Sequence, residues 1–184
     1  MSKTPPDNSH PDNSLADNSQ YEAIRDLKAI RQTKPDPLSA KDLHDILEVA
    51  RWTGSSKNNQ NWAFITVTGG QKAKLSEAGD FTVPLQVAPI AIAIAMAPLG
   101  YEFDIGKAAQ NIMLAAQAIG VASCPITLHR EEQAAATLGL PDGWRCRYAV
   151  TLGYPTDDAA PMKFGGRKPA EEVIFSERFG GKAT

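Results

Sequence analysis

The residues best suited to chemistry form one polar run, residues 53–62, with the sequence TGSSKNNQNW. This run follows an apolar helical pattern and precedes a strand-like stretch, residues 63–68. Loops held between rigid elements are where binding groups concentrate. Hydroxyls, side-chain amides and exposed backbone N–H groups suit a flat heterocycle with polar edges. The run therefore predicts a binding loop, and the alternative is an asparagine-rich turn between a helix and a strand.

Composition limits the possible functions before any further motif is considered. The chain has 184 residues, 42% of them hydrophobic, which predicts one globular domain with a sizeable core. Its formal charge is −2, from 19 basic and 21 acidic residues, so composition gives no reason to expect nucleic acid as a partner. No apolar run approaches the ~18 residues of a membrane span, and the amino terminus lacks the layout of a secretory signal. We therefore expect a cytoplasmic protein with no membrane partner.

Cysteine and histidine form no catalytic or metal-binding pattern. Cys124 and Cys146 stand in apolar, strand-like contexts, where buried free thiols are ordinary, and we interpret both as structural. The histidines, His10, His44 and His129, lack metal-ligand spacing, and position alone pairs no nucleophile with a base. We expect no metal, and a bound cofactor to carry the chemistry.

The elements that position the polar run follow from sequence periodicity. Residues 1–19 repeat Asp-Asn-Ser three times with almost nothing to bury, which predicts a disordered tail before a single domain, residues 20–184. Strand patterns occupy residues 62–68, 88–97, 121–126 and 145–152. Helical patterns occupy residues 21–32, 71–78, 104–119 and 131–138, and a further helix begins after a capping Ser39.

Two elements indicate how the domain is layered. In residues 88–97, isoleucines and Met96 share one face and alanines share the other, so this strand is covered on both sides. Residues 104–119 are apolar nearly all round, which predicts a helix that ends at Gly120 and is buried on more than one side. Its alanine-rich surface lets another helix approach closely, so we expect this helix to contribute to a dimer.

Four blocks of the sequence, in order, carry a family pattern: residues 31–37, the loop from Ser55 to Trp62, residues 108–116 before Gly120, and Gly153-Tyr154-Pro155 with Arg167-Lys168-Pro169. Together they resemble the nitroreductase family, the FMN-dependent reductases. In the loop, four residues are in register with the family motif P-S-x-x-N-x-Q-P-W: Ser55, Asn58, Gln60 and Trp62. Gly54 and Asn61 replace the two prolines of that motif. The resemblance spans about residues 21–175.

This resemblance implies an α+β protein with a nitroreductase-like three-layer fold, in which helices flank a central mixed sheet. It also implies an intertwined homodimer with FMN in the subunit interface and a carboxyl-terminal segment that embraces the partner. The apolar patch at residues 173–175 has little of its own chain to pack on and fits that role. The alternative is a tail helix that docks on its own subunit.

The resemblance further assigns residues to the FMN and substrate site. Two groups would line it: the loop residues Ser55, Ser56 and Asn58, and the strand-end residues Pro125, Ile126, Thr127 and Leu128. The serines would serve the partner's flavin, and Gln60 would brace the loop. A backbone N–H of Thr127 or Leu128 would bond the flavin N5 atom, although these residues also fit a plain strand end.

Basic residues would neutralise the FMN phosphate. The first helix of the family supplies an arginine, a serine and a further basic residue, where this chain has Leu27, Ala29 and Arg31. Only Arg31 is kept, and it would lie by the pyrimidine edge, where a cation stabilises reduced flavin. Arg167 matches a late family arginine on the phosphate. Lys28 either compensates for the lost positions or stays on a solvated helix face.

The implied activity is hydride transfer from NAD(P)H through FMN to nitro compounds, quinones or similar electron-poor acceptors. Residues 97–104 are too few for the helical insertion that covers the pocket in larger family members, which predicts an open pocket. The expected partners are a second copy of the chain and a small-molecule electron acceptor. Two alternatives remain open: a specialised flavin reaction such as dehalogenation or flavin breakdown, and a flavin-binding protein with little turnover.

Overall fold

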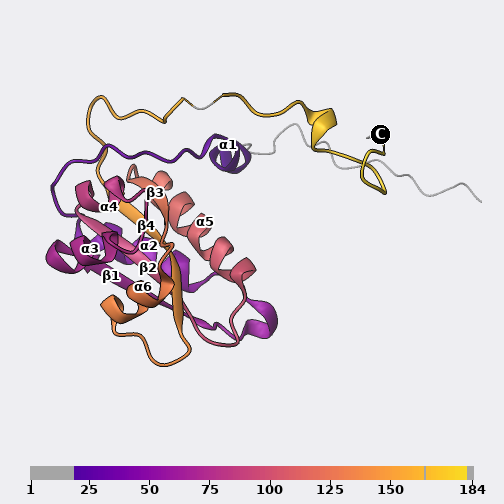
Figure 1. Ribbon diagram of the computed structural model, residues 1–184. Coiled ribbons are helices and arrows are strands. Elements are labelled where there is room, and N and C mark those ends of the chain that lie inside the picture. The colour runs from indigo at the N-terminus through magenta and orange to yellow at the C-terminus, as the bar shows by residue number, and fades with distance from the viewer. Residues whose placement is uncertain (1–18, 164, 182–184) are drawn as a thin grey trace, which may run out of the picture.

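A four-stranded antiparallel sheet forms the centre of the protein, for which the computed structural model describes residues 19–163 and 165–181 (Figure 1). Its strands are β1 (Trp62–Thr68), β2 (Ile90–Met96), β3 (Ala122–Thr127) and β4 (Arg145–Gly153). They lie in the order β1-β2-β4-β3, and every neighbouring pair is antiparallel. The two edge strands are therefore β1 and β3, on opposite sides of the sheet.

The pairing of the strands corrects the prediction of a mixed sheet, whereas the α+β class is confirmed. Between β1 and β2 lie α3 (Gly69–Ser76) and α4 (Val83–Val87), and between β3 and β4 lies α6 (Glu131–Leu138). Each of these two connections joins antiparallel neighbours, so the chain re-enters the sheet at the end that it has just left. The strands β2 and β4 also run antiparallel, although β3 lies between them in the sequence.

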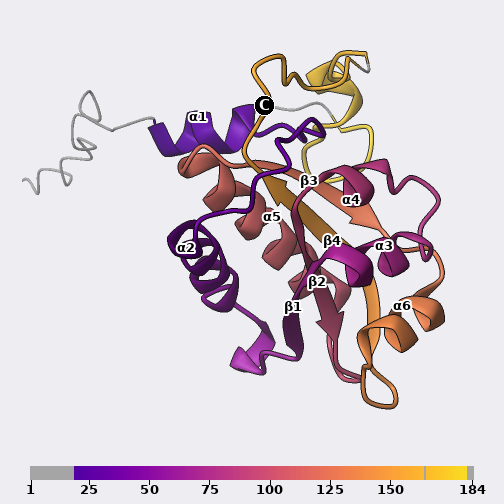
Figure 2. The same cartoon turned by 90° about the vertical axis from the view of Figure 1, so that its left-hand side faces the viewer.

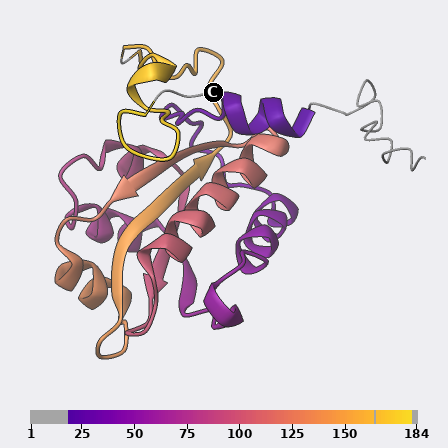
Figure 3. The ribbon, with the colours of Figure 1, turned by 90° about the vertical axis from the view of Figure 1, so that its right-hand side faces the viewer.

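Helices cover both faces of the sheet, which confirms the three-layer architecture (Figure 2). One face carries α2 (Ala40–Arg51) and the 17-residue α5 (Glu102–Ala118), packed on the isoleucine side of β2. The other face carries α3, α4 and α6, packed on the alanine side. All seven residues of β2 are buried, as their alternation predicted. Figure 3 shows the long α5 running diagonally in front of the sheet, with α2 beside it.

Local sequence accounts for where several helices begin and end. Ser39 caps α2, because its hydroxyl accepts the Asp42 backbone N–H at 3.0 Å. After α5 and after α6, Gly120 and Gly139 adopt positive φ values of 75° and 63°, which glycine tolerates without steric cost. Ser39 and Gly120 confirm the predicted cap of α2 and the predicted end of the long apolar helix.

The first helix is shorter than predicted. Helix α1 (Ser19–Asp26) ends six residues before the expected boundary, and residues 27–32 have no helical structure. Instead the Ile30 N–H donates to the Ser123 carbonyl at 2.8 Å, and Thr33 forms a bridge with Pro155. The spacing of Ile24, Leu27 and Ile30 favours a helix, but pairing with an open sheet edge overrides this weak local preference.

The carboxyl-terminal arm, defined here as residues 156–163 and 165–181, leaves the domain (Figure 1). Near its start, Thr156 donates to the Gln32 carbonyl at 3.4 Å and Asp157 pairs with Lys34 at 3.1 Å. From residue 160 onward, the hydrogen bonds seen in the described part of the arm stay within it, including a short turn, η3 (Ala170–Glu172). Val173 and Ile174 of the apolar patch are each 56% exposed.

Other predictions fall partly beyond the described residues. The predicted tail, residues 1–19, lies outside them except for Ser19, the first residue of α1. Over residues 19–163 and 165–181, every helix is too short or too polar to cross a membrane. Both cysteines are buried free thiols, as the structural interpretation of Cys124 and Cys146 requires.

Candidate functional site

The polar run forms a loop between α2 and β1 with an unusual backbone. A short turn, η2 (Ser56–Asn58), lies within it. Lys57, Asn58 and Gln60 have φ values of 51°, 55° and 51°, a region that residues other than glycine rarely adopt and that recurs at functional sites. The Ser55 hydroxyl accepts the Gln60 N–H at 2.9 Å, and the Gln60 amide donates to the Asn58 carbonyl at 3.3 Å. Gln60 thus braces the loop.

Helix α5 tethers this loop through two polar side chains. The Asp104 carboxylate accepts the Ser56 backbone N–H at 3.2 Å and forms an ion pair with Lys107 at 2.9 Å. The hydrogen bond from Lys107, and then that from Ser56, lower the pKa of Asp104. The Asn111 amide donates to the Thr53 hydroxyl at 2.9 Å. Sequence reasoning assigned no role to either residue, because a carboxylate in the first turn of a helix is ordinary.

Open grooves lie on both sides of the loop. One, of about 570 Å³, runs along Asn59, Asn61 and the short connection of residues 98–101. The other, of about 660 Å³, lies along α5, where Phe103 is 75% exposed. The connection from β2 to α5 carries no helical insertion, because β2 ends at Met96 and α5 begins at Glu102. The surface around the loop is therefore open, as the short connection predicted.

The edge of β3 contains the second predicted group. The Leu128 N–H donates to the Arg147 carbonyl at 2.7 Å, so in this antiparallel ladder the N–H of Thr127 points to the open edge. Pro125, which has no N–H, occupies another outward position, where an edge strand tolerates proline. Ile126 and Leu128 are buried in the core. Of the two backbone groups predicted to face a flavin, Thr127 is available and Leu128 is already bonded.

Two basic residues lie beside this edge. Lys28 and Arg31 belong to the non-helical segment that pairs with Ser123, so neither stands on a helix face as predicted. Lys28 lines a pocket of about 180 Å³ with Leu27, Ile30 and residues 120–123. Burial raises the pKa of the Cys124 thiol, and the nearby charge of Arg31 opposes that rise. A partly exposed cation therefore lies close to the middle of β3.

A single chain does not bring all the predicted site residues together. Ser55, Ser56 and Asn58 precede β1, whereas Lys28 and Arg31 accompany β3 at the opposite edge. Three strand spacings, roughly 14 Å, separate these edges. Arg167 lies exposed on the carboxyl-terminal arm. In the described parts of the chain, no cluster of three or more potential ligands is placed to hold a metal.

Comparison with known proteins agrees with this architecture. The chain matches the nitroreductase family over residues 24–91 and 97–154. A protein of Archaeoglobus fulgidus, provisionally named an NADH dehydrogenase/NAD(P)H nitroreductase, is 33% identical over 143 residues, which are 71% of this chain and 82% of that protein. The family match and this relative identify an α+β oxidoreductase. The chain belongs to the nitroreductase family.

Solved structures share the fold at low sequence identity. An FMN-dependent nitroreductase of Clostridium difficile aligns with a TM-score of 0.75 and 23% identity, over 86% of this chain and 99% of that one. A protein of Desulfovibrio desulfuricans, provisionally named a nitroreductase, was solved in complex with FMN. It aligns with a TM-score of 0.75 and 23% identity, over 89% of this chain and 99% of that one. At such identities the similarity establishes the three-layer fold and nothing more.

Proposed function

We propose that this protein is an FMN-dependent oxidoreductase that passes hydride from NAD(P)H to nitro compounds, quinones or similar electron-poor acceptors. The observation that carries the proposal is the open edge of β3, where the N–H of Thr127 points outward beside a segment with Lys28 and Arg31. A donor and cations on one edge suit a flat anionic cofactor. The name of the Archaeoglobus relative and the FMN complex of a similar fold support it.

Bound FMN supplies the redox chemistry, and the residues of the chain bind and orient it. The Thr127 N–H would hold the ring edge that receives hydride. Arg31 would stabilise the negative charge that reduction places on the ring, because a fixed cation acts strongly where charge develops. Lys28 and Arg167 would neutralise the phosphate.

The division of the site between two sheet edges supports a homodimer. Ser55, Ser56 and Asn58 would form the wall of a site whose other residues come from a second chain. Apolar surface for that contact is offered by the exposed Phe103 of α5 and by Val173 and Ile174 of the arm. The arm, which its own domain leaves uncovered, would then embrace the partner. The expected cytoplasmic location stays a prediction.

The decisive experiment combines flavin binding with turnover. We expect the purified protein to bind about one FMN per chain and to oxidise NAD(P)H faster when menadione is added. Light scattering at micromolar concentration should give the mass of a dimer. Failure to bind FMN would refute the proposal, and a monomeric mass would remove the shared site.

A second candidate is a flavin-binding protein with little turnover. Leu27 and Ala29 favour it, because these residues stand where the family places polar phosphate ligands. Such a protein would bind FMN but show no stimulation by menadione over buffer. The same assay therefore separates the two functions.

A further inference from the structure

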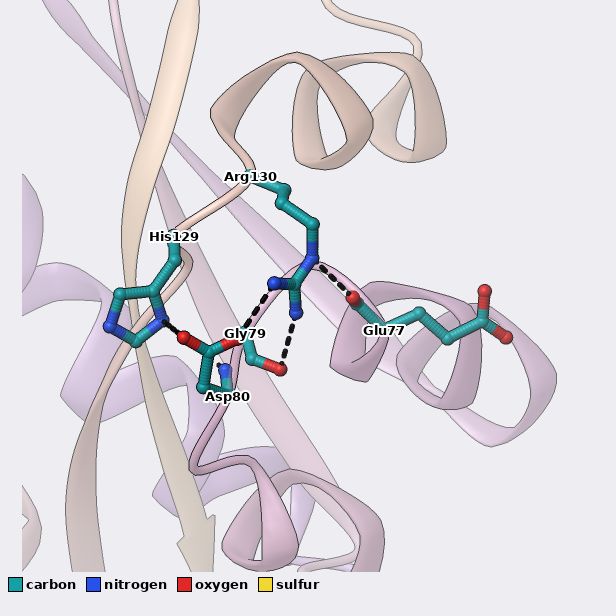
Figure 4. A network of polar contacts seen from close by, with 5 residues as sticks. All are labelled: Glu77, Gly79, Asp80, His129 and Arg130. Carbon is teal, nitrogen blue, oxygen red and sulfur yellow. Dashed lines mark hydrogen bonds and ion pairs between the residues drawn. The ribbon is translucent and has the colours of Figure 1, made fainter.

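One arginine ties the loop between α3 and α4 to the end of β3 (Figure 4). Arg130 donates from Nε to the Glu77 carbonyl at 3.0 Å, and from its two terminal nitrogens to the Gly79 carbonyl at 2.8 Å and the Asp80 carboxylate at 2.6 Å. Its backbone N–H donates to the Ala78 carbonyl at 2.9 Å. All three guanidinium nitrogens therefore bind residues 77–80, which we call the clamp loop.

The clamp loop rests directly against the carbonyl of Thr127. A Cβ atom added to Gly79 would lie 2.8 Å from the Thr127 oxygen and 2.5 Å from the Thr82 methyl group. Real Cβ atoms essentially never come so close, so a larger residue at position 79 would force the loop and the strand end apart. The clamp loop thus packs directly on the Thr127 carbonyl, so a shift of the loop would disturb the end of β3.

His129 holds the clamp loop from the other side. Its Nδ1 atom accepts the Asp80 backbone N–H at 3.2 Å and lies 3.6 Å from the Asp80 carboxylate. The hydrogen bond from Arg130 lowers the pKa of Asp80, so this carboxylate is charged at neutral pH. Asp80 therefore contacts both His129 and Arg130, which lie two and three residues beyond the end of β3.

The exposure of this network argues against a role confined to global stability. The side chains of Arg130 and Asp80 are 47% and 50% exposed, and ion pairs so open to solvent contribute little to the free energy of unfolding. A planar guanidinium with three partners on one loop instead fixes geometry. What it fixes is the contact between the clamp loop and Thr127.

We propose that Arg130 is a positioning residue for the cofactor site: it holds the clamp loop against Thr127 and so fixes the outward-facing Thr127 N–H. The inference rests on the proposed function, because that N–H matters only where FMN lies on the β3 edge. Arg130 would thus support the cofactor site without contacting the cofactor itself.

The test compares Arg130→Gln with Arg145→Gln. Arg145 is a matched control because it is 51% exposed and pairs with Glu102 and Glu131, but has no described contact with the clamp loop.

Titration of ¹⁵N-labelled protein with FMN follows the Thr127 amide resonance, and spectroelectrochemistry gives the midpoint potential of FMN at saturation. We expect Arg130→Gln to weaken FMN binding about tenfold, the scale of a lost charge-assisted bond. The midpoint potential of FMN bound to this variant should also fall, because a displaced Thr127 N–H stabilises the reduced ring less.

A merely structural role would change the melting temperature and leave the potential of bound FMN unmoved. FMN affinity, Thr127 shift and potential equal to those of Arg145→Gln would overturn the inference while leaving the proposed function intact. If the unaltered protein binds no FMN, or if FMN does not move its Thr127 resonance, the assignment of the β3 edge fails and the inference fails with it.

Two further variants guard against a folding defect. Asp80→Asn removes the ion pair but leaves the carbonyl partners of Arg130, so its effects should be smaller and in the same direction. Arg130→Lys restores the charge without the three-way geometry and should recover only part of the affinity. Full recovery by lysine would show that charge, and not loop geometry, determines binding.

Discussion

The two faces of the sheet support the two halves of the candidate site by different means. On the isoleucine face, long helices α2 and α5 pack on bulky side chains of β2, and α5 tethers the polar loop through Asp104 and Asn111. On the alanine face, the short helices α3, α4 and α6 pack on small side chains, and the clamp loop supports the end of β3.

This difference shows how a layer of short helices is held. Helices of eight, five and eight residues each bury little apolar area, so polar side chains fasten them to backbone carbonyls. Lys72 of α3, only 6% exposed, donates to the Leu85 carbonyl at 2.6 Å and to the Gln86 carbonyl at 3.2 Å. Arg130 does the same for the clamp loop. Apolar volume holds one layer, and polar bonds to the backbone hold the other.

The largest expected effect comes from the isoleucine face. Ile92→Ala removes a side chain with no solvent exposure and should lower the free energy of unfolding by about 2–5 kcal/mol. Urea unfolding followed by circular dichroism measures this cost. The control is Thr66→Ala, at the exposed position that pairs with Ile92 on β1, which should stay within about 0.5 kcal/mol. Equal costs for the two variants would contradict the idea that this face depends on apolar volume.

A smaller loss is expected from the polar fastening of the other face. Lys72→Met keeps the apolar stem but leaves the carbonyls of Leu85 and Gln86 without their donor, at a cost of about 1–3 kcal/mol in the free energy of unfolding. Burial lowers the pKa of Lys72, so methionine also relieves a desolvation cost and the loss should fall near the lower value. Lys74→Met, on an exposed position of the same helix, is the control. A stabilising Lys72→Met would show that the ammonium group does not hold this layer.

Sequence reasoning succeeded where structure is local and failed where it depends on distant partners. The alternation in β2 and the glycine after α5 were sufficient to place those elements, because side-chain period and backbone freedom act within a few residues. The end of α1 at Asp26 depends on pairing with Ser123, nearly a hundred residues away. Antiparallel pairing depends on contacts between strands that lie far apart in the sequence, which the periodicity of one segment does not reveal.

The candidate site divides in the same way. Its polar loop was recognisable from residue types, but the tether from Asp104 to Ser56 and the clamp from Arg130 join positions about 50 residues apart. Neither carries a local signature, because a carboxylate or an arginine at a helix start is ordinary. Assignments that resemblance made at Ser55, Asn58 and Arg167 remain predictions for the experiments proposed above.

A third prediction tests whether solvent reaches the core on the alanine face. Burial raises the pKa of the Cys146 thiol from 9.0 to about 12. Between these values the folded protein keeps a proton that the unfolded chain releases, so its free energy of unfolding falls as pH rises, by up to about 1.4 kcal/mol per pH unit. Urea titrations from pH 8 to 10.5 should show a shallower decline for Cys146→Ala than for the unaltered protein. Parallel declines would mean that solvent reaches this thiol.

The smallest expected effect concerns the tether on the isoleucine face, and it is measured in ligand affinity. Asp104→Asn keeps the shape of the side chain and an oxygen that can accept the Ser56 N–H, but it removes the charge that strengthens this bond and attracts Lys107. Because a neutral acceptor is weaker, we expect FMN affinity to fall about fivefold, with the loop slightly loosened. Asp45→Asn, which breaks only a surface pair with Lys41, is the control. If Asp104→Asn lowers the melting temperature and leaves FMN affinity unchanged, this tether serves the packing of α5 and not the site. The two faces would then differ in function as well as in the interactions that stabilise them, because of the two supports only the clamp loop would affect FMN binding.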